Sequence, residues 1–406
     1  MDREARRDHA LRCFIVAGEH SGDALGAKLM AALRKAEARP IRFEGVGGPD
    51  MAAEGLQSIF PISDVAVMGP LAILAALPRL VRRIYQAAAA GIAMRPDAVV
   101  IIDSPEFTHP IARRIRRQLP LVPVIDYVSP SVWAWRPGRA ARMRAYVDHV
   151  LALLPFEPEA HRRLGGPTCT YVGHPLIERL PVIAMGDGDA LRRRLALDPQ
   201  RKTVVALPGS RRSEVSRLMQ PFGEALALTA ARVGPLNVVI PAVESVSSVI
   251  AAALADWPLP AHVVGGEDAK LQAFKAADAA LAASGTVTLE LALAGTPMIV
   301  GYRVDALAAR LQFLVKTPHF ALANLVLGER AFPELMQDDC TPPKLAEALS
   351  ALLTDGEILA AQRRALLRVP EVMELAAGTP GEAAAAIVRH YALEGRLDAS
   401  AQPRPA

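Results

Sequence analysis

The chain has 406 residues, 51% of them hydrophobic and 22% charged, which is enough material for two or three domains with sizeable cores. Lys and Arg number 46 and Asp and Glu 42, so the net charge is only +4 and does not indicate a nucleic-acid-binding protein. The three cysteines, Cys13, Cys169 and Cys340, form no C-x-x-C pair, which excludes a disulfide scaffold and a Cys-rich zinc site.

Continuous apolar runs alternate with longer segments rich in Ala, Leu and Arg along the chain. Such runs predict strands buried on both faces, and their alternation with helices predicts parallel sheets in an α/β fold. Helix starts are predicted where Ser21 and Asp23 precede Leu25 and where Thr286 precedes Leu289. The predicted strands are residues 13–17, 98–103, 122–128, 149–154, 203–208, 237–241, 279–284 and 297–302.

The Gly- and Pro-rich residues 173–189 separate two groups of predicted strands and are interpreted as an interdomain linker. Each half is expected to build its own sheet, with a ligand in the cleft between the sheets at the carboxyl ends of the strands. A final helix is expected up to about Glu394, followed by a disordered tail at 396–406. Because the first 20 residues lack the apolar core of a signal peptide, we expect a cytoplasmic protein.

Two loops of the first half carry candidate site residues. Residues 18–23, GEHSGD, follow the first predicted strand and offer glycines and a helix N-terminus to an anion or a sugar hydroxyl, although a tight turn with an Asp cap explains them equally well. Asp103 ends a strongly apolar strand, where burial could raise its pKa toward that of a general base. The alternative is that Asp103 caps the next helix, and His109 is expected to be exposed or to act as a cap.

A third loop, YVSPSVWAWR, holds two of the three tryptophans, Trp133 and Trp135. Aromatic faces in a loop suit stacking on a sugar or an acyl chain. The alternative is a loop that plugs the core. Because packing alone gives no reason for two tryptophans and Arg136 in one loop, we predict a binding site.

The second half carries the sequence LPGSRRSE between a predicted strand and a helix. Gly209 permits close backbone approach, Ser210 can cap the helix, and Arg211 and its neighbour can bind phosphate oxygens, so this segment is interpreted as a pyrophosphate cradle. Residues 283–290, ASGTVTLE, again place small residues before a helix, and Glu290 suits ribose hydroxyls. A simple capped helix would explain this second pattern equally well.

Several common signatures are missing from the sequence. It contains no dinucleotide fingerprint, P-loop, nucleophile elbow or H-E-x-x-H pattern. We therefore predict neither a protein-bound metal nor a cofactor.

The motifs GEHSGD, GVGGPDM, AVMG, IDSPEF, YVSPSVWAWR, LPFE, VGHPL, LPGSR, ASGTVTLE and NLVLG occur in an order and spacing that resemble the lipid-A-disaccharide synthases. The resemblance covers about residues 11–345. Two positions depart from the family pattern: His20 replaces a common Ala, and Glu106 stands where Asp is frequent. These departures concern only details of hydrogen bonding on the acceptor side.

The resemblance implies a GT-B fold with two Rossmann-like domains whose parallel sheets face across a cleft. Residues 1–173 would form the domain that faces the acceptor and the membrane, joined by a C-terminal helix at about 376–395, and residues 174–375 would bind the UDP-sugar. The implied reaction joins UDP-2,3-diacylglucosamine to 2,3-diacylglucosamine 1-phosphate with inversion, giving a β-1,6-linked disaccharide and UDP. A homodimer is left open.

By the same resemblance, Asp103 would take the proton of the acceptor 6-hydroxyl and Glu19 would lie beside it; the competing assignment makes Glu19 the base. Arg211 would hold the donor diphosphate and Glu290 the ribose. The predicted substrate-binding residues are Gly18, Ser21, Ser129, Trp133, Trp135, Gly209, Ser210, Ser284, Gly285, Thr286, Glu290 and Asn324.

The apolar residues 65–77 are too few for the ~20 residues of a transmembrane helix. Residues 67–85 place Met68, Leu71, Ile73, Leu74, Leu77 and Leu80 near Arg79, Arg82 and Arg83. This combination suits the anionic surface of the inner membrane, and peripheral association is expected. The alternative is a core helix with a solvated basic end. Arg113, Arg114, Arg116 and Arg117 are expected to form a solvated helix face.

Two alternatives stay open on sequence grounds. Another UDP-sugar enzyme of the GT-B type, a cell-wall glycosyltransferase or a UDP-sugar 2-epimerase, shares the motifs of the UDP side. A binding protein without chemistry would lack the strand-end acid, which is present here as Asp103.

Overall fold

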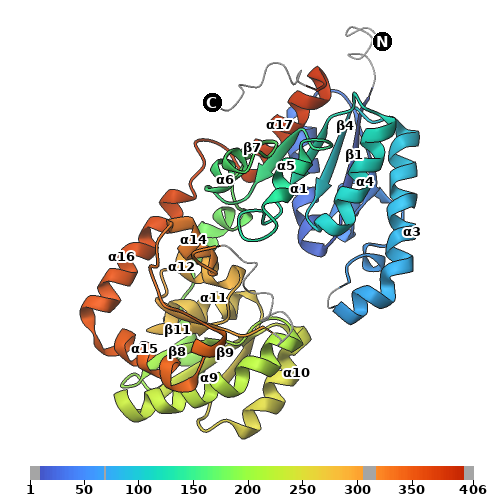
Figure 1. Ribbon diagram of the computed structural model, residues 1–406. Coiled ribbons are helices and arrows are strands. Elements are labelled where there is room, and N and C mark those ends of the chain that lie inside the picture. Colours follow the sequence, from blue (N-terminus) through green and yellow to red (C-terminus); the bar gives the residue numbers. More distant parts are fainter. Residues whose placement is uncertain (1–9, 68–69, 305–316, 397–406) are drawn as a thin grey trace. The chain divides into compact units, whose positions relative to one another are not determined.

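The computed structural model describes residues 10–67, 70–304 and 317–396. The chain divides into two compact units, one made of Met1–Pro175 with Leu375–Ala406 and the other of Leu176–Glu374 (Figure 1). Each unit is an α/β structure around one parallel sheet, which confirms the predicted fold class.

The first unit contains a seven-stranded parallel sheet in the order β3-β2-β1-β4-β5-β6-β7. Its strands are β1 Leu11–Ala17, β2 Ile41–Val46, β3 Gln57–Ser58, β4 Ala98–Ile102, β5 Val124–Tyr127, β6 His149–Ala152 and β7 Thr168–Tyr171. The central strands β1 and β4 are apolar on both faces because helices cover both sides of the sheet. The strand order reverses between β1 and β4, so the loops after these two strands flank the crevice in which such sheets bind ligands.

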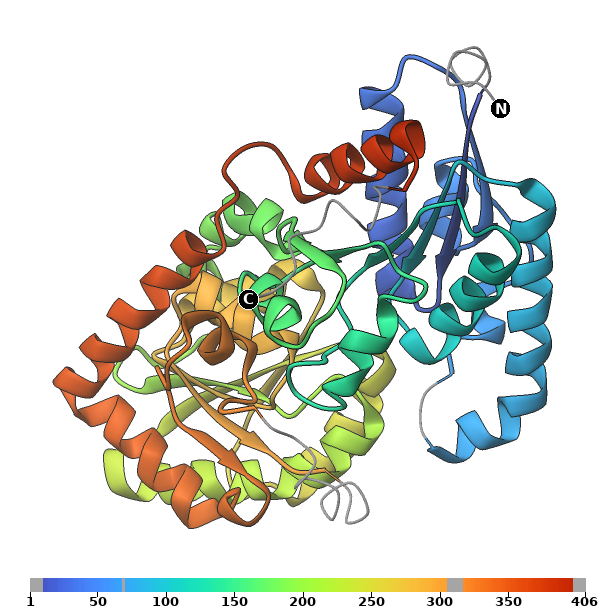
Figure 2. The same cartoon turned by 45° about the horizontal axis from the view of Figure 1, so that its top comes forward.

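The helices of the first unit include one that returns from the C-terminal end of the chain. They are α1 His20–Ala36, α2 Pro49–Ala53, η1 Ile62–Asp64, α3 Pro70–Met94, α4 Pro105–Gln118, α5 Gly138–Met143, α6 Glu157–Arg163 and α17 Pro380–Glu394. Helix α17 packs on α1 (Figure 2) and adds two ion pairs, Lys35–Glu382 at 2.8 Å and Arg389–Glu37 at 3.0 Å. Of the predicted tail, residues 397–406 lie outside the described chain, whereas Arg396 is held by an ion pair with Asp148 at 2.8 Å.

The start of α1 corrects one expectation. Asp23 does not cap its own helix; it is buried, and its carboxylate accepts the backbone N–H groups of Gly48, Asp50 and Met51 at 2.7, 3.0 and 3.1 Å. These donors open helix α2, so Asp23 caps α2 from a neighbouring helix. A cap that bridges 25 residues of sequence has no local signature.

The second unit repeats the same design with a six-stranded parallel sheet in the order β10-β9-β8-β11-β12-β13. Its strands are β8 Lys202–Leu207, β9 Leu236–Ala242, β10 His262–Gly265, β11 Ala279–Ala282, β12 Met298–Tyr302 and β13 Glu334–Met336. The strand order reverses between β8 and β11, a position called the topological switch point of the sheet. The two predicted site loops, which follow β8 and β11, lie beside it.

The helices of the second unit are η2 Pro175–Arg179, which begins at the last residue of the first unit, α7 Leu180–Ala184, α8 Gly188–Arg194, α9 Arg212–Val233, α10 Glu244–Ala253, η3 Leu254–Asp256, α11 Glu267–Ala276, α12 Thr286–Ala294, α14 Leu322–Leu327, η5 Gln337–Asp339, α15 Pro342–Thr354 and α16 Gly356–Val372. The boundary between the two units lies within residues 173–189, and this segment contains η2, α7 and the start of α8. The buried Ile183 on α7 and the contact of α7 with α12 anchor this segment to the second unit.

Candidate functional site

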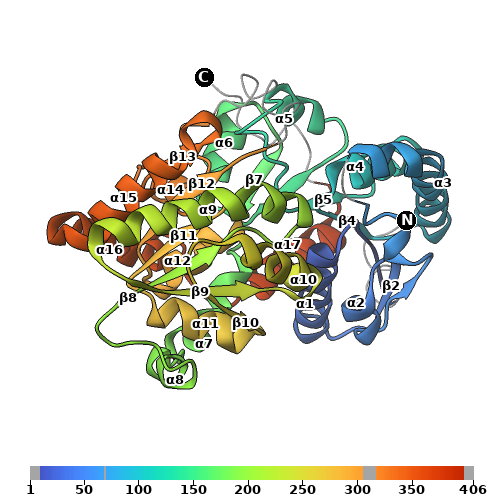
Figure 3. The same ribbon diagram turned by 90° about the horizontal axis from the view of Figure 1, so that it is seen from below.

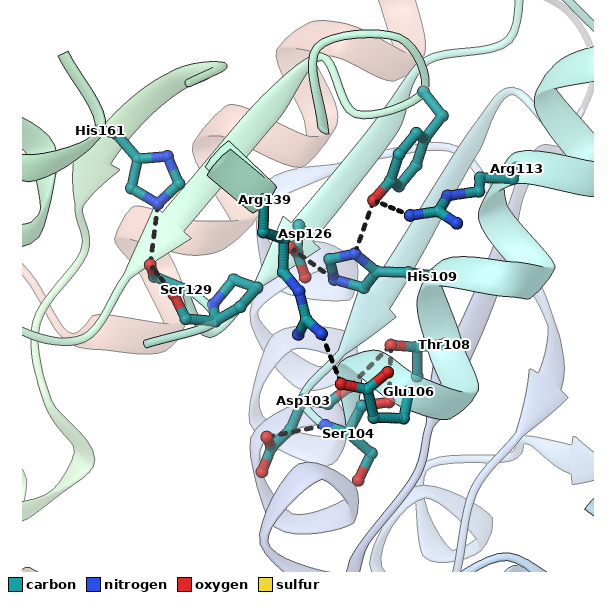
Figure 4. Close-up of polar contacts among 12 residues, drawn as sticks. Asp103, Ser104, Glu106, Thr108, His109, Arg113, Asp126, Ser129, Arg139 and His161 are labelled. Atoms are coloured by element: carbon teal, nitrogen blue, oxygen red, sulfur yellow. Dashed lines mark hydrogen bonds and ion pairs between the residues drawn. The ribbon is translucent and has the colours of Figure 1, made fainter. Parts of the chain in front are cut away.

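Two consecutive non-glycine residues directly after β4 have a strained backbone. Asp103 and Ser104 have φ angles of +54° and +44°, a left-handed conformation that costs a non-glycine residue ~1–3 kcal/mol. The surrounding structure enforces it: the Asp103 N–H donates to the Tyr127 carbonyl at 3.1 Å, and the Thr108 hydroxyl donates to the Asp103 carbonyl at 2.7 Å (Figure 4). Strain held in this way at a strand end is typical of a functional position.

The strained turn brings together four residues predicted from two separate loops. The Asp103 carboxylate accepts the Ser104 N–H at 2.7 Å and lies 3.4 Å from the Ser21 hydroxyl. The Ser104 hydroxyl donates to Glu19 at 3.1 Å. Gly18 is required here because a Cβ atom would lie 2.3 Å from the Ser104 Cβ. Sequence reasoning missed Ser104, which connects the two carboxylates.

A buried polar cluster lies beside this turn, on α4 and β5 (Figure 4). His109 Nε2 lies 3.2 Å from Asp126 Oδ2, and His109 Nδ1 lies 2.9 Å from the Tyr146 hydroxyl, to which Arg113 donates at 3.1 Å. Burial raises the pKa of Asp126, although the nearby His109 lowers it in part. The expectation that His109 is exposed or a cap is therefore wrong, since the ring is buried.

In the tryptophan loop, two of the three predicted ligand contacts face the protein. Ser129 is buried with its hydroxyl 2.8 Å from His161 Nε2 (Figure 4), and the Trp133 indole N–H donates to Glu157 at 3.1 Å. This geometry favours a loop-positioning role for Ser129 and Trp133 over direct substrate contact. Trp135 is 40% exposed and can stack on a ligand.

Glu157 comes from the LPFE motif and lies buried at the start of α6. Besides the Trp133 indole, it accepts the Leu154 N–H at 3.0 Å. Burial raises the pKa of Glu157 to about 7, against the lowering effect of these hydrogen bonds. The motif thus connects the end of β6 to the tryptophan loop.

In the second unit, a buried glutamate organises the loop after β8. Glu214 accepts the N–H groups of Ser210 and Arg211 at 3.1 and 3.3 Å. Gly209 has a φ of +118°, and a Cβ atom there would lie 2.5 Å from the Glu214 Cβ. The Arg211 side chain is 58% exposed and contacts Glu214 at 3.2 Å, so the loop presents a guanidinium to solvent from a fixed backbone.

The loop after β11 leads into α12 through Gly285, which is the N-cap and makes no side-chain cap bond. Gly285 and Thr286 are exposed, so the backbone N–H groups at this helix end can bind an anion. Ser284 donates to the Phe320 carbonyl at 3.2 Å. Glu290 lies on the second turn of α12 and is mostly buried, with Lys270 at 2.9 Å.

The predicted substrate contact Asn324 lies in the interior of its unit. Its side chain is fully buried, donates to the Phe332 carbonyl and to Glu334 at 3.1 and 2.8 Å, and accepts the Ala331 N–H at 2.9 Å. These hydrogen bonds connect α14 to the turn that follows it. In the described residues, no three His, Cys, Asp or Glu side chains group as a metal site would require.

Both units place their site loops at the carboxyl ends of parallel strands beside a switch point, and the architecture defines a protein of the two-Rossmann-domain GT-B class. The UDP-GlcNAc 2-epimerase from Neisseria meningitidis, solved with UDP-GlcNAc, has a TM-score of 0.62 at 13% identity, covering 94% of this chain and 99% of that chain. CalG4, the calicheamicin glycosyltransferase, has a TM-score of 0.54 at 16% identity, covering 94% and 98%. At these identities the likeness concerns the fold alone.

Sequence comparison gives the particular family. The family model of lipid-A-disaccharide synthetase matches residues 13–387. The lipid-A-disaccharide synthase of Nitrobacter hamburgensis is 50% identical over 378 residues, which cover 93% of this chain and 94% of that protein. The chain belongs to the lipid-A-disaccharide synthetase family, which confirms the resemblance. It is therefore a glycosyltransferase of lipid A synthesis, and the epimerase and cell-wall alternatives are not favoured.

Proposed function

We propose that the protein transfers diacylglucosamine from UDP-2,3-diacylglucosamine to the 6-hydroxyl of 2,3-diacylglucosamine 1-phosphate. The acceptor oxygen attacks the anomeric carbon while the bond to the UDP oxygen breaks, which gives the β-linked disaccharide 1-phosphate and UDP. One displacement inverts the anomeric centre and needs one base. The observation that carries this proposal is the strained turn that fixes Asp103 beside Glu19 at the carboxyl ends of β4 and β1.

In this proposal Asp103 accepts the proton of the acceptor hydroxyl. One of its carboxylate oxygens is fixed by the Ser104 N–H, which aims the group without neutralising it. Glu19, held by the Ser104 hydroxyl, then orients the acceptor. The competing assignment exchanges these two roles.

The second unit supplies the groups for UDP. The exposed Arg211 guanidinium suits a bidentate contact with the diphosphate and stabilises the charge that grows on departing UDP. The N–H groups at the start of α12, beside Ser284, Gly285 and Thr286, bind phosphate oxygens. Glu290, one turn further, accepts the ribose hydroxyls.

The test is a mass-spectrometric assay of the purified full chain with the two acylated sugars. The expected product is the tetraacyl disaccharide 1-phosphate, with one UDP released for each disaccharide formed. UDP release without an acylated acceptor, or the appearance of a 2-epimer of the donor, would contradict the proposal.

Helix α3 supports the further proposal that the protein associates peripherally with the cytoplasmic face of the inner membrane. Leu74, Leu77, Val81 and Tyr85 are exposed and follow one another at spacings of three and four residues, so they lie on one face of the helix. Leu74 alone is 67% exposed. An exposed apolar stripe of this kind suits a lipid interface.

The other face of α3 packs in the core through Leu80. The helix therefore has both features that the sequence offered as alternatives, an exposed apolar surface and a face packed in the core. Arg79 and Arg82 are exposed beside the stripe, while Arg83 pairs with Asp64 at 2.9 Å. The side chains of Met68, Leu71 and Ile73 lie outside the described residues.

The basic cluster on α4 is not uniformly solvated, because Arg116 is buried and pairs with Asp148. In the described part of the chain, no helix has the length and hydropathy that a membrane crossing requires.

A further inference from the structure

Glu290 belongs to a cluster of alternating charges in the second unit. Lys270 Nζ on α11 lies 2.9 Å from Glu290 Oε1 and 3.0 Å from Glu267 Oε1. Arg179, at the end of η2, reaches the same Glu290 oxygen at 3.5 Å and also pairs with Glu267. Helices α11 and α12 are in contact (Figure 3). Both cations therefore meet one and the same oxygen of Glu290.

This arrangement leaves the other carboxylate oxygen for a ligand. A carboxylate accepts through two oxygens, and the described contacts of Glu290 all involve Oε1. The side chains of Lys270 and Glu290 are only 20% and 12% exposed, so water screens their attraction less than that of a surface pair. Burial raises the pKa of Glu267, but the hydrogen bonds from Arg179 and Lys270 outweigh it and lower the pKa overall, which favours the ionised form of this carboxylate.

The position of Glu290 along α12 fits a nucleotide. It lies four residues after Thr286, which is ~6 Å along the helix axis. That separation is on the scale of the distance between the diphosphate and the ribose hydroxyls of one nucleotide. A phosphate on the helix N-terminus would thus bring the ribose to the second turn.

We propose that Lys270 is a positioning residue that fixes Glu290 through Oε1, so that Oε2 accepts the ribose hydroxyls of a nucleoside diphosphate. The inference rests on the proposed function for the assignment of the ribose to Glu290. Lys270 holds the carboxylate in the binding rotamer before the ligand arrives, which removes an ordering cost from binding. Arg179 supports the same oxygen at a longer distance.

A purely structural role would make Lys270 a tie between α11 and α12. The chain offers a matched control for that reading. Lys275 lies on the same helix, and its Nζ donates to the Ala294 carbonyl at the far end of α12 at 3.1 Å. Lys270→Met and Lys275→Met therefore each remove one link between the same two helices.

The experiment measures the dissociation constants of UDP and 2′,3′-dideoxy-UDP by calorimetry with the full chain. Wild type is expected to prefer UDP about ten-fold, which corresponds to ~1.4 kcal/mol. We expect this preference to fall to about two-fold in Lys270→Met, to persist in Lys275→Met, and to return largely in Lys270→Arg, because a guanidinium also donates to the carboxylate. If Lys270→Met does not fold, Lys270→Leu, which also lacks a hydrogen-bond donor, makes the same measurement.

Glu290→Ala separates failure of the inference from failure of the proposed function. If Glu290→Ala loses the preference for UDP but Lys270→Met and Lys270→Leu keep it, the positioning role of Lys270 is overturned and the ribose assignment stands. If Glu290→Ala keeps the preference, the ribose assignment itself is wrong, and the role of Lys270 falls with it.

Discussion

In each unit a buried glutamate holds a predicted site loop, but the hydrogen-bond partners of the two glutamates differ in charge. In the first unit, buried Glu157 accepts the Trp133 indole and a backbone N–H, which are neutral donors, and burial raises its pKa to about 7. In the second unit, buried Glu214 accepts two backbone N–H groups and also contacts the Arg211 guanidinium. A buried carboxylate with a cation partner carries its charge at lower cost than one with neutral donors only.

The proposed chemistry differs between the two units in the same way, with neutral partners in the first unit and a cation in the second. The first unit contributes a proton acceptor, Asp103, which neutral hydroxyl and N–H groups hold. The second contributes a cation, Arg211, and a helix N-terminus for an anionic leaving group. Substitutions in the first unit should therefore impair proton transfer, and substitutions in the second unit should impair UDP binding. The most informative variants change one of these two steps and leave the other intact.

The largest effect is expected for Asp103→Asn, which removes the proton acceptor and keeps the size of the side chain. Turnover should fall by roughly 10²–10⁴-fold with unchanged UDP affinity, because general-base catalysis contributes on that scale. Kinetics and calorimetry on the same preparation measure both quantities. Glu106→Gln, on the first turn of α4 and exposed, is the control and should change turnover less than about three-fold.

A companion variant decides between the two carboxylates. If Asp103→Asn kept most of the activity and the acid limb of the pH–rate profile while Glu19→Gln lost both, Glu19 would be the base.

Arg211→Ala is expected to lower turnover by roughly 10²–10³-fold and to weaken UDP binding as well, because the guanidinium meets charge that grows on the diphosphate. Lys at this position should rescue only part of the loss, since an ammonium cannot reproduce the planar fork. Arg232→Ala, at an exposed position in the last turn of helix α9, which begins just after Arg211, makes the same change in charge and should have little effect. If Arg211→Ala bound UDP with wild-type affinity, the assignment of UDP binding to Arg211 in the second unit would be wrong.

Glu157→Gln tests whether the buried Glu157 has a raised pKa in the folded chain. Because the folded pKa of about 7 exceeds the ordinary value of 4.5, the native chain binds this proton more tightly; its contribution to stability is complete below pH 4.5 and is lost as the pH rises through 7. The free energy of unfolding of wild type relative to Glu157→Gln should therefore fall by on the order of 3 kcal/mol between pH 4.5 and 8.

Denaturant unfolding at several pH values measures this difference. The buried His161, with a pKa lowered to about 4 by burial, titrates with the opposite slope in both proteins and cancels in the difference. Glu159→Gln, at an exposed position of the same helix, is the control. Parallel stability curves for wild type and Glu157→Gln would show that Glu157 does not bind its proton more tightly in the folded chain.

The smallest effect is expected for the surface of α3. Replacing Leu74, Leu77 and Val81 by Ser should weaken binding to anionic vesicles about ten-fold and leave the activity on detergent-dispersed short-chain substrates intact, because the removed side chains are exposed. Vesicle sedimentation measures the binding. Met185→Ser, an exposed apolar position of the second unit, is the control. Unchanged vesicle binding together with a lower unfolding temperature would assign these residues to packing instead.

The strands predicted from sequence are those that the sheets bury most deeply. All eight correspond to strands of the structure, from β1 to β12. The missed strands occupy the outer positions of the sheets, and they are β2, β3, β7, β10 and β13. Outer strands such as β3 and β10 are largely exposed, so they do not need a continuous apolar run and leave no such signal.

The site shows the same division between local and distant information. The positions of Asp103 and Arg211 at the carboxyl-end edges of the sheets were predictable, because each residue closely follows an apolar strand and parallel strands present their carboxyl ends at one edge. The burial of Asn324 and Ser129 was not predictable, because it depends on hydrogen bonds to other segments of the chain.

The sequence by itself determined the α/β class, the family and the loops that carry the proposed site, since hydrophobic runs and short motifs are local properties of the chain. Only the tertiary structure decided that Ser104 connects Asp103 to Glu19, that Asp23 caps a different helix, and that Lys270 and Glu290 meet. These partners are 20 to 85 residues apart in the sequence, and the packing of the elements alone brings their side chains within hydrogen-bond distance.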